Sequence, residues 1–275
     1  MSQSGVVIMA TIDVAGCTLH YDVRGSGEPL VLVHGTGTDS TTWDPVIELL
    51  AAEYRVVTYD RRGYGRSVHR PVRDYRVHAA DLEMILARVC ERPAHVVGWS
   101  SGGNVSLAVA ASGTSRMRSL CVVEPPFHSV RLADRSVLAT TARVKWKQLR
   151  GDRVGAAEAF FRSVYSHRTG RNAYDDAEER VREMMRSNAG PVLAEFDPHP
   201  FGVSSDHVSV RDVAAAAVPM RWVLGDQSPP WLERIYQRFA RHRGDVERVV
   251  IRGVGHLAHE EDPQAFAAAV KPTVT

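Results

Sequence analysis

The sequence predicts an α/β protein built on a mostly parallel sheet of eight strands, with helices on both faces and a helical insertion. Three observations lead to this prediction. Short apolar runs alternate with amphipathic segments along most of the chain, glycine-rich motifs follow several of those runs, and residues 127–215 break the alternation. A chain of 275 residues is long enough for one large domain of this kind with a sizeable core.

The first half of the chain shows the alternation clearly. Residues 11–23 alternate apolar and polar, which is typical of an antiparallel edge hairpin, and Ala15-Gly16 supplies its turn. In the segment 77–90, apolar side chains recur at spacings of three and four, as they do on one face of a helix. The other elements expected here are a buried strand at 30–33, a helix at 45–53 and a strand at 54–59.

The second half returns to the sheet pattern on either side of a long helical segment. Strands are expected up to Gly98 and at 119–123, 220–224 and 246–251, with helices at 231–242 and from Pro263 onward. Residues 127–215 lack strand rhythm and are rich in arginine, methionine and aromatic side chains. We therefore expect residues 1–126 and 216–275 to form the core, and residues 127–215 to form a helical cap with an apolar cleft beneath it.

One turn between a strand and a helix carries a motif with chemical meaning. The run Gly98-Trp99-Ser100-Ser101-Gly102 fits the pattern G-x-S-x-G, in which a sharp turn lifts the central side chain clear of the sheet. Glycine on either side lets neighbouring segments approach closely. A buried strand precedes the motif and a helical pattern follows it, which is the context that a nucleophilic serine requires. Ser100 is therefore the candidate nucleophile.

A serine nucleophile needs a base and an oxyanion hole. His256 is the best base, because it follows the last expected strand and so lies at the same edge of the sheet as the Ser100 turn. The turn itself offers the backbone N–H of Ser101 to an oxyanion. A second donor is expected from the loop after the first parallel strand, as the N–H of Thr36 or Gly35.

Two carboxylates compete for the role of the acid that orients the histidine. Glu124 ends one of the expected strands, and the two prolines after it fix the chain there. Asp226 follows the next strand, but it comes directly after a glycine and prolines stiffen the loop beyond it. Both lie at the active-site edge, and the glutamate side chain is the longer. We favour Glu124 as the acid and keep Asp226 as the alternative.

Taken together, these motifs resemble those of the α/β-hydrolase superfamily along essentially the whole chain. The matching segments are His34-Gly35-Thr36-Gly37, Asp60-Arg61-Arg62-Gly63-Tyr64-Gly65-Arg66-Ser67, Gly98-Trp99-Ser100-Ser101-Gly102 and Gly255-His256. Most members carry the acid as Gly-x-x-Asp after the strand that here ends at Leu224, where this chain has Ser228. The chain is similar to the zearalenone lactonases, whose acid is a glutamate at the position of Glu124. Within the second segment, we expect Asp60 and Arg62 to hold a structural turn.

Composition excludes several other classes of function. A net charge of +2 gives no basis for binding nucleic acid, and no apolar run approaches the roughly 20 residues that span a membrane. The N-terminal segment lacks the features of a signal peptide, and the three scattered cysteines fit a reducing compartment, so a cytoplasmic protein is expected. Neither a metal nor a cofactor is expected. The oligomeric state stays open, a homodimer included.

The function expected from the resemblance and the residues is serine hydrolysis of a carboxylic ester or lactone of modest size. The substrate is a small molecule, and the reaction passes through an acyl-enzyme on Ser100. Two alternatives stay open. The same three residues could cleave a C–C bond or cyclise a natural-product intermediate, and a hydrolase fold can also bind a ligand without catalysis.

Overall fold

The computed structural model of the chain describes residues 8–72, 74–127, 135–196 and 208–272, and within them eight strands form one sheet. The sheet order is β1-β2-β4-β3-β5-β6-β7-β8, antiparallel at β1, β2 and β4 and parallel from β4 through β8. The strands are β1 (Ile8–Val14), β2 (Cys17–Arg24), β3 (Glu28–Val33), β4 (Tyr54–Tyr59), β5 (Ala94–Trp99), β6 (Met117–Val123), β7 (Met220–Gly225) and β8 (Glu247–Ile251). The predicted fold class is confirmed.

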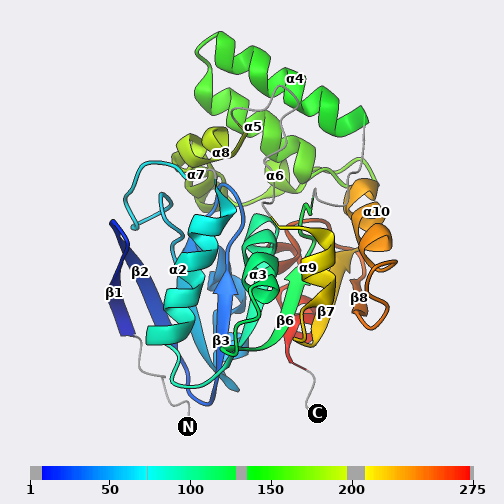
Figure 1. Cartoon of the computed structure of the whole chain (residues 1–275). Helices are drawn as coiled ribbons and strands as arrows, with labels where there is room; N and C mark the ends of the chain where they lie inside the picture. Colours follow the sequence, from blue (N-terminus) through cyan, green and yellow to red (C-terminus); the bar gives the residue numbers. More distant parts are fainter. Residues whose placement is uncertain (1–7, 73, 128–134, 197–207, 273–275) are drawn as a thin grey trace.

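Helices cover both faces of this sheet (Figure 1). On one face α1 (Asp44–Ala51) packs against α11 (Ala258–Glu261) and α12 (Pro263–Val270), after a short 3-10 helix at Ser40–Trp43. On the other face α3 (Ser101–Ala111) packs between α2 (Tyr75–Arg88) and α9 (Val210–Ala215), and α10 (Pro230–Phe239) lies against β7. Among the connections between parallel strands, α1 thus lies on one face, whereas α2, α3, α9 and α10 lie on the other.

The two faces are held by two separate apolar clusters, and the strands supply both through the alternation of their side chains. In β5, Val96 belongs to the cluster beneath α2 and α3, whereas Val97 belongs to the cluster beneath α1 and α12. In β3, Val31 and Leu32 divide in the same way. A strand buried on both faces reads as a continuous apolar run, which explains why these runs were legible in the sequence.

A layer of helices lies above the carboxyl ends of the parallel strands (Figure 1). Its members are α4 (Arg135–Leu149), α5 (Arg153–Val164), α6 (Ala173–Asp176), α7 (Glu179–Ser187) and α8 (Ala189–Phe196), referred to below as the helical layer. Phe161 of α5 and Val192 of α8 are buried in the same apolar cluster as Trp99 of β5. Apolar contact therefore fixes the layer to the sheet. Helix α9, which the sequence placed within the cap segment, packs against α3 beside the sheet instead.

The boundaries of the elements differ from expectation by a few residues, for local reasons. Helix α2 begins at Tyr75 rather than at residue 77, because the Asp74 side chain accepts a hydrogen bond from the backbone N–H of Arg76 and caps the helix there. The hairpin of β1 and β2 turns at Ala15-Gly16 as predicted, with Gly16 at a φ of 74°.

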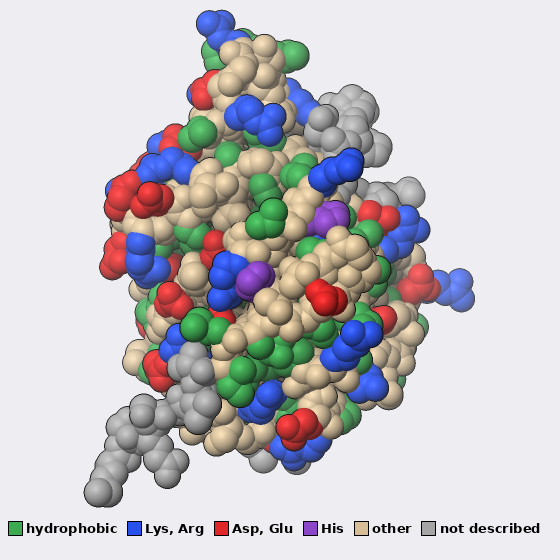
Figure 2. All heavy atoms as spheres, turned by 90° about the vertical axis from the view of Figure 1, so that its left-hand side faces the viewer, with side chains coloured by type: hydrophobic (Ala, Val, Ile, Leu, Met, Phe, Trp, Pro, Cys, Tyr) green, Lys and Arg blue, Asp and Glu red, His purple; other side chains and the backbone are tan. Residues whose placement is uncertain are grey.

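The surface carries both signs of charge. On the face shown in Figure 2, acidic and basic side chains are interspersed and do not gather into one field. None of the described helices is long and apolar enough to cross a membrane.

Candidate active site

Ser100 occupies the sharp turn between β5 and α3, with φ at 53° and ψ at −127°. A non-glycine residue in this region costs about 1–3 kcal/mol and persists only where its surroundings hold it. The flanking glycines make the turn possible. A Cβ at Gly98 would lie 2.6 Å from the carbonyl oxygen of Gly102, and a Cβ at Gly102 would lie 2.5 Å from that of His34. The strained turn presents the serine hydroxyl at the edge of the sheet.

Ser100, His256 and Glu124 come together at this edge. His256 Nε2 lies 3.1 Å from Ser100 Oγ, and His256 Nδ1 lies 2.6 Å from Glu124 Oε2. His256 and Glu124 are both 1% exposed, so the interaction between them is shielded from water. With Nδ1–H donating to the carboxylate, Nε2 is left as the acceptor that faces the serine.

The glutamate is itself fixed in place. Its backbone has a φ of 49°, and its other carboxylate oxygen, Oε1, accepts a hydrogen bond of 2.7 Å from the backbone N–H of Gly225. In the described structure, Ser100 and Glu124 are the non-glycine residues with positive φ. Strained backbone of this kind gathers at functional sites. Both strained positions hold a side chain that contacts His256.

Asp226, the alternative acid, makes its hydrogen bonds to its neighbouring residue and to the turn after β8. One of its carboxylate oxygens accepts hydrogen bonds of 2.8 Å from the backbone N–H of Gly253 and of 3.0 Å from the side chain of Gln227. The bond to Gly253 ties the end of β7 to the turn after β8. Among the hydrogen bonds of the described residues, none joins Asp226 to His256.

Trp99 links the serine turn to the histidine loop. Its indole N–H donates a hydrogen bond of 2.9 Å to the carbonyl oxygen of His256, and its ring lies 5.5 Å from the imidazole. Tyr165 of the helical layer lies 5.7 Å from the same imidazole. His259 lies in α11 and is fully buried, with its ring 4.4 Å from that of Trp99. The loop that carries His256 is therefore held by aromatic contacts from the core and from the helical layer.

The loop after β3 runs directly beside Ser100. A Cβ at Gly35 would lie 3.0 Å from the Cβ of Ser100, which brings the backbone of Gly35 and Thr36 to the serine. Burial and the neighbouring Arg61 lower the pKa of His34 to about 3, so its ring is neutral at physiological pH. That ring bonds the carbonyl of Gly35 at 2.9 Å and accepts the backbone N–H of Arg61 at 2.9 Å. His34 thereby fixes the loop where an oxyanion donor is expected.

Two functional neighbours were missed in the sequence: Arg61 and Glu195. Glu195, from α8, lies beside the Thr36 hydroxyl, accepts a hydrogen bond of 2.6 Å from Tyr64 and pairs with Arg61 at 3.3 Å. Arg61, which is fully buried, also donates to Ser101 Oγ at 3.1 Å. The signal for Glu195 was a single carboxylate in an otherwise apolar helical run.

Within the segment 60–67, Asp60 and Arg62 hold the turn as expected. Asp60 does so through the backbone N–H of Ser40, and Arg62 through the carboxylate of Asp81.

A cavity of about 90 Å³ opens next to Ser100 and His256. Loops at the carboxyl ends of the strands, the helices α2 and α10, and the helical layer line it. The lining residues are Thr36, Tyr75, Ser100, Pro126, Val137, Thr140, Thr141, Phe160, Ser163, Val164, Glu195, Trp231 and His256. Phe160 of α5 is the aromatic side chain of the helical layer among these lining residues. Trp146 of the same layer is 56% exposed instead, and Met185 is buried in the apolar cluster between layer and sheet.

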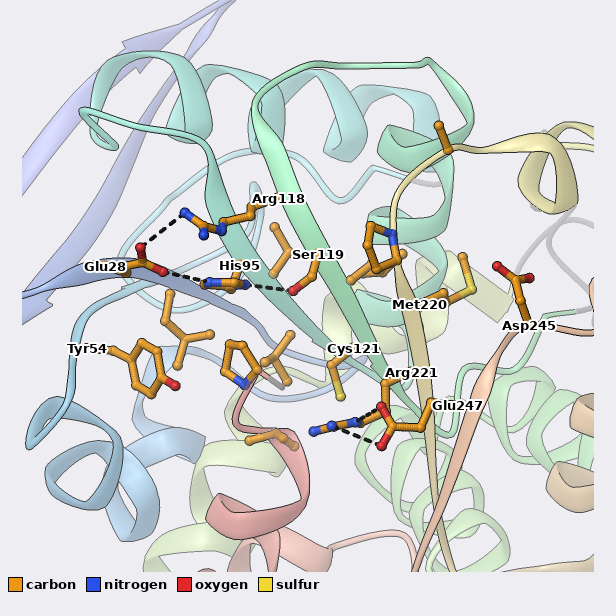
Figure 3. Close-up of a pocket in the computed structure, with 18 of the residues that line it drawn as sticks. Glu28, Tyr54, His95, Arg118, Ser119, Cys121, Met220, Arg221, Asp245 and Glu247 are labelled. Atoms are coloured by element: carbon orange, nitrogen blue, oxygen red, sulfur yellow. Dashed lines mark hydrogen bonds and ion pairs between the residues drawn. The ribbon is translucent and has the colours of Figure 1, made fainter. Parts of the chain in front are cut away.

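A larger cavity, of about 590 Å³, lies at the opposite ends of the strands (Figure 3). It contains a second serine–histidine–glutamate arrangement, in which His95 Nδ1 lies 2.7 Å from Ser119 Oγ and His95 Nε2 lies 3.1 Å from Glu28. Ser119 sits within strand β6, without the strained turn and following helix that Ser100 has. The same three residue types therefore lack the surroundings of a nucleophile here.

No group of three or more histidine, cysteine, aspartate or glutamate side chains in the described ranges could hold a metal ion.

Comparison with known proteins places this geometry in a family. The chain is 40% identical over 118 residues to the uncharacterized hydrolase YraK of Bacillus subtilis, an alignment covering 42% of this chain and 44% of that protein. It is 35% identical over 106 residues to the pimeloyl-[acyl-carrier protein] methyl ester esterase of Aliivibrio salmonicida, covering 38% and 39%. These alignments thus span less than half the length of the curated relatives.

Among solved structures, an esterase from Thermogutta terrifontis superimposes with a TM-score of 0.73 at 26% identity, over 96% of both chains. Residues 30–269 match the sequence profile described as the alpha/beta hydrolase family, and that match covers most of the chain. The eight-stranded sheet, the strained serine turn and the histidine after the last strand therefore belong together: the chain is a member of the alpha/beta hydrolase family.

Proposed function

We propose that this protein is a serine hydrolase that cleaves a carboxylic ester or lactone through Ser100, His256 and Glu124. The observation that carries the proposal is the chain of contacts from Ser100 Oγ to His256 Nε2, at 3.1 Å, and from His256 Nδ1 to Glu124 Oε2, at 2.6 Å. The names of the relatives, which include esterases, support ester substrates.

The reaction begins with attack of Ser100 Oγ on the ester carbonyl while His256 Nε2 takes the hydroxyl proton. Glu124 stabilises the imidazolium that forms, because its carboxylate lies against Nδ1–H in a buried site. The backbone N–H groups of Ser101 and Thr36 are the proposed donors to the tetrahedral oxyanion, with that of Gly35 as a further candidate. His256 then returns its proton to the departing alkoxide, which leaves an acyl group on Ser100.

The second half of the reaction uses the same groups on water. His256 Nε2 removes a proton from water as the water oxygen attacks the acyl carbonyl, and the tetrahedral intermediate collapses to free acid and Ser100 hydroxyl. A lactone opens by the same steps, with its own ring oxygen as the leaving group. The helical layer would act as the cap of this site, since α4, α5 and α8 supply part of the cavity wall.

The test compares the wild-type protein and two serine variants on a panel of alkyl esters, lactones and substrates with a hydrolysable C–C bond. Ser100→Ala should lower kcat by about 10⁴-fold or more, because the nucleophile is gone while alanine fits the turn at least as well as serine. Ser119→Ala, which removes the serine of the far cavity, should leave turnover unchanged. Turnover of any panel ester by Ser100→Ala at near wild-type rate would disprove the mechanism. If the wild-type protein cleaves the C–C substrates and not the esters, then the same three residues carry out the alternative reaction, C–C bond hydrolysis.

A further inference from the structure

Glu195 is the acidic side chain among the residues that line the active-site cavity. It lies in the helical layer, on α8, and it reaches down to the loop after β3. Its carboxylate is 7% exposed, so its charge acts in a site with little water. The established family membership and the proposed reaction assign it no role.

The carboxylate is held by three donors, one from the loop after β3 and two from the segment 60–67 that follows β4. The hydroxyl of Thr36 contacts Oε2, while the Tyr64 hydroxyl at 2.6 Å and the Arg61 guanidinium at 3.3 Å donate to Oε1. Burial, with the carboxylate beside it, raises the pKa of Tyr64 well above its ordinary value of 10, so the phenol stays a donor. Side chains that donate suit a carboxylate, which can only accept.

A chain of hydroxyls connects this carboxylate to the serine turn. Thr36 Oγ1 lies 2.7 Å from Ser101 Oγ, which accepts from Arg61 at 3.1 Å. Because Thr36 has one hydroxyl hydrogen and an acceptor-only carboxylate beside it, that hydrogen goes to Glu195, and Ser101 donates to Thr36 in turn. Thr36 and Ser101 are the residues whose backbone N–H groups are proposed to bind the oxyanion. The negative charge of Glu195 therefore lies one side chain away from the reacting carbonyl.

Arg61 offsets this charge only in part on the side that faces the cavity. It is fully buried and absent from the cavity wall, whereas Glu195 forms part of that wall. An incoming substrate thus meets the carboxylate first, with the guanidinium behind it. A second carboxylate brought into a cavity of about 90 Å³ would have little room to avoid Glu195, and burial leaves little water to screen the repulsion.

We propose that Glu195 is a specificity-determining residue that selects substrates with an uncharged acyl group and rejects those with an anionic one. The proposal rests on the proposed function, because it assumes that the acyl group enters the cavity beside Ser100. Specificity here comes from a repulsive element built into the pocket rather than from an added attraction.

The test uses two fluorophosphonates with chains of equal length, one ending in a methyl group and one in a carboxylate. In each case Ser100 Oγ bonds to phosphorus and fluoride leaves, so the labelling rate reports on the cavity whatever the natural substrate is. The wild-type protein should react with the neutral probe at least about tenfold faster than with the anionic probe. Glu195→Gln should bring the two rate constants to within about threefold of each other.

Two further variants separate charge from structure. Glu195→Asp keeps the charge and should keep the wild-type preference, even if both of its rates fall through the shorter side chain. Glu183→Gln removes one negative charge from an exposed position on α7 and should change neither rate. An unchanged ratio of the two rates in Glu195→Gln, or equal rates in the wild-type protein, would overturn the proposal. Failure of both probes to label the wild-type serine would instead refute the proposed function.

Discussion

Glu124 combines a backbone conformation that is rare for non-glycine residues with a carboxylate whose two oxygens bind different groups. At a φ of 49° it sits where few non-glycine residues are found, and its two oxygens hold different groups, His256 Nδ1 and the backbone N–H of Gly225. One side chain thus ties together the ends of β6 and β7 and the loop after β8. In most hydrolases of this fold the corresponding carboxylate comes from the next strand, where this chain has Asp226 bound to its own loop.

This division of roles predicts that two isosteric substitutions will have unequal effects. Glu124→Gln places an amide where an acceptor is needed and favours the wrong histidine tautomer, so kcat should fall by about 10⁴-fold. Asp226→Asn keeps an oxygen for the Gly253 N–H and should change kcat by less than about tenfold. Steady-state kinetics on one turned-over ester measures both. If Asp226→Asn proves the more damaging variant, Glu124 loses the role of the acid.

Three buried histidines whose pKa is lowered by burial, His34, His78 and His259, predict how stability depends on pH. Burial lowers the pKa of His34 and of His259 to about 3, against about 6.5 in the unfolded chain. Between these values the unfolded chain binds more protons, so the free energy of unfolding falls as the pH drops below about 6.5 and is unaffected by these groups above it. Each histidine should contribute a slope of up to about 1.4 kcal/mol per pH unit.

Urea unfolding at pH 7.5, 6.0 and 5.0 measures this slope, and His259→Gln isolates one of its three sources. The glutamine removes the titrating ring but can still bond to Thr42, which lies 2.9 Å from His259 Nε2. The variant should be less stable at pH 7.5, yet it should lose less stability than the wild-type protein on acidification. Parallel curves for the two proteins would show that His259 is not buried in its neutral form.

At the scale of the elements, the start of α3 is the most tightly constrained junction. Gly102 is the second residue of this helix, and the carbonyl oxygens of the loop after β3 fill the space that a side chain would need. The close approach brings Gly35 and Thr36 to Ser100, so the same glycine that shapes the turn also places the proposed oxyanion donors.

Gly102→Ala should therefore destabilise the fold by about 1–3 kcal/mol or more, because the new methyl group meets backbone atoms that cannot move aside. The matched control is Gly244→Ala, at an exposed position with open space and no positive φ, where alanine should be neutral or stabilise by up to about 1 kcal/mol. Chemical denaturation of both variants measures the difference. Equal stability of the two would mean that the loop after β3 lies further from α3.

At the scale of the whole molecule, parallel strand order brings distant parts of the chain to one edge. Ser100, Glu124 and His256 follow β5, β6 and β8, whose carboxyl ends share one side of the sheet. Because that rule needs only the order of the strands, the sequence could predict these three neighbours. It favoured Glu124 over Asp226 only from the loops that follow them, because the direction of two side chains at adjacent strand ends is not visible in the sequence.

The helical layer was the part that the sequence described least. Its helical character could be predicted from the sequence. The position of each helix on the core could not, because it depends on contacts between residues far apart in the chain. The Thr36–Glu195 contact, which joins positions 159 residues apart, is of this kind. Apolar spacing identifies a buried face without saying what that face meets, so Glu195 and Arg61 became visible only with the layer in place.

The most direct test of the account is the site at which a fluorophosphonate labels the wild-type protein. Intact mass spectrometry and peptide mapping after reaction with a neutral alkyl fluorophosphonate should find one adduct per chain, on Ser100. Ser119→Ala should label as the wild-type protein does, and Ser100→Ala should not label. An adduct on any other residue, or none under conditions that label a known serine esterase, would contradict the assignment of Ser100 as a nucleophile activated by His256 and Glu124.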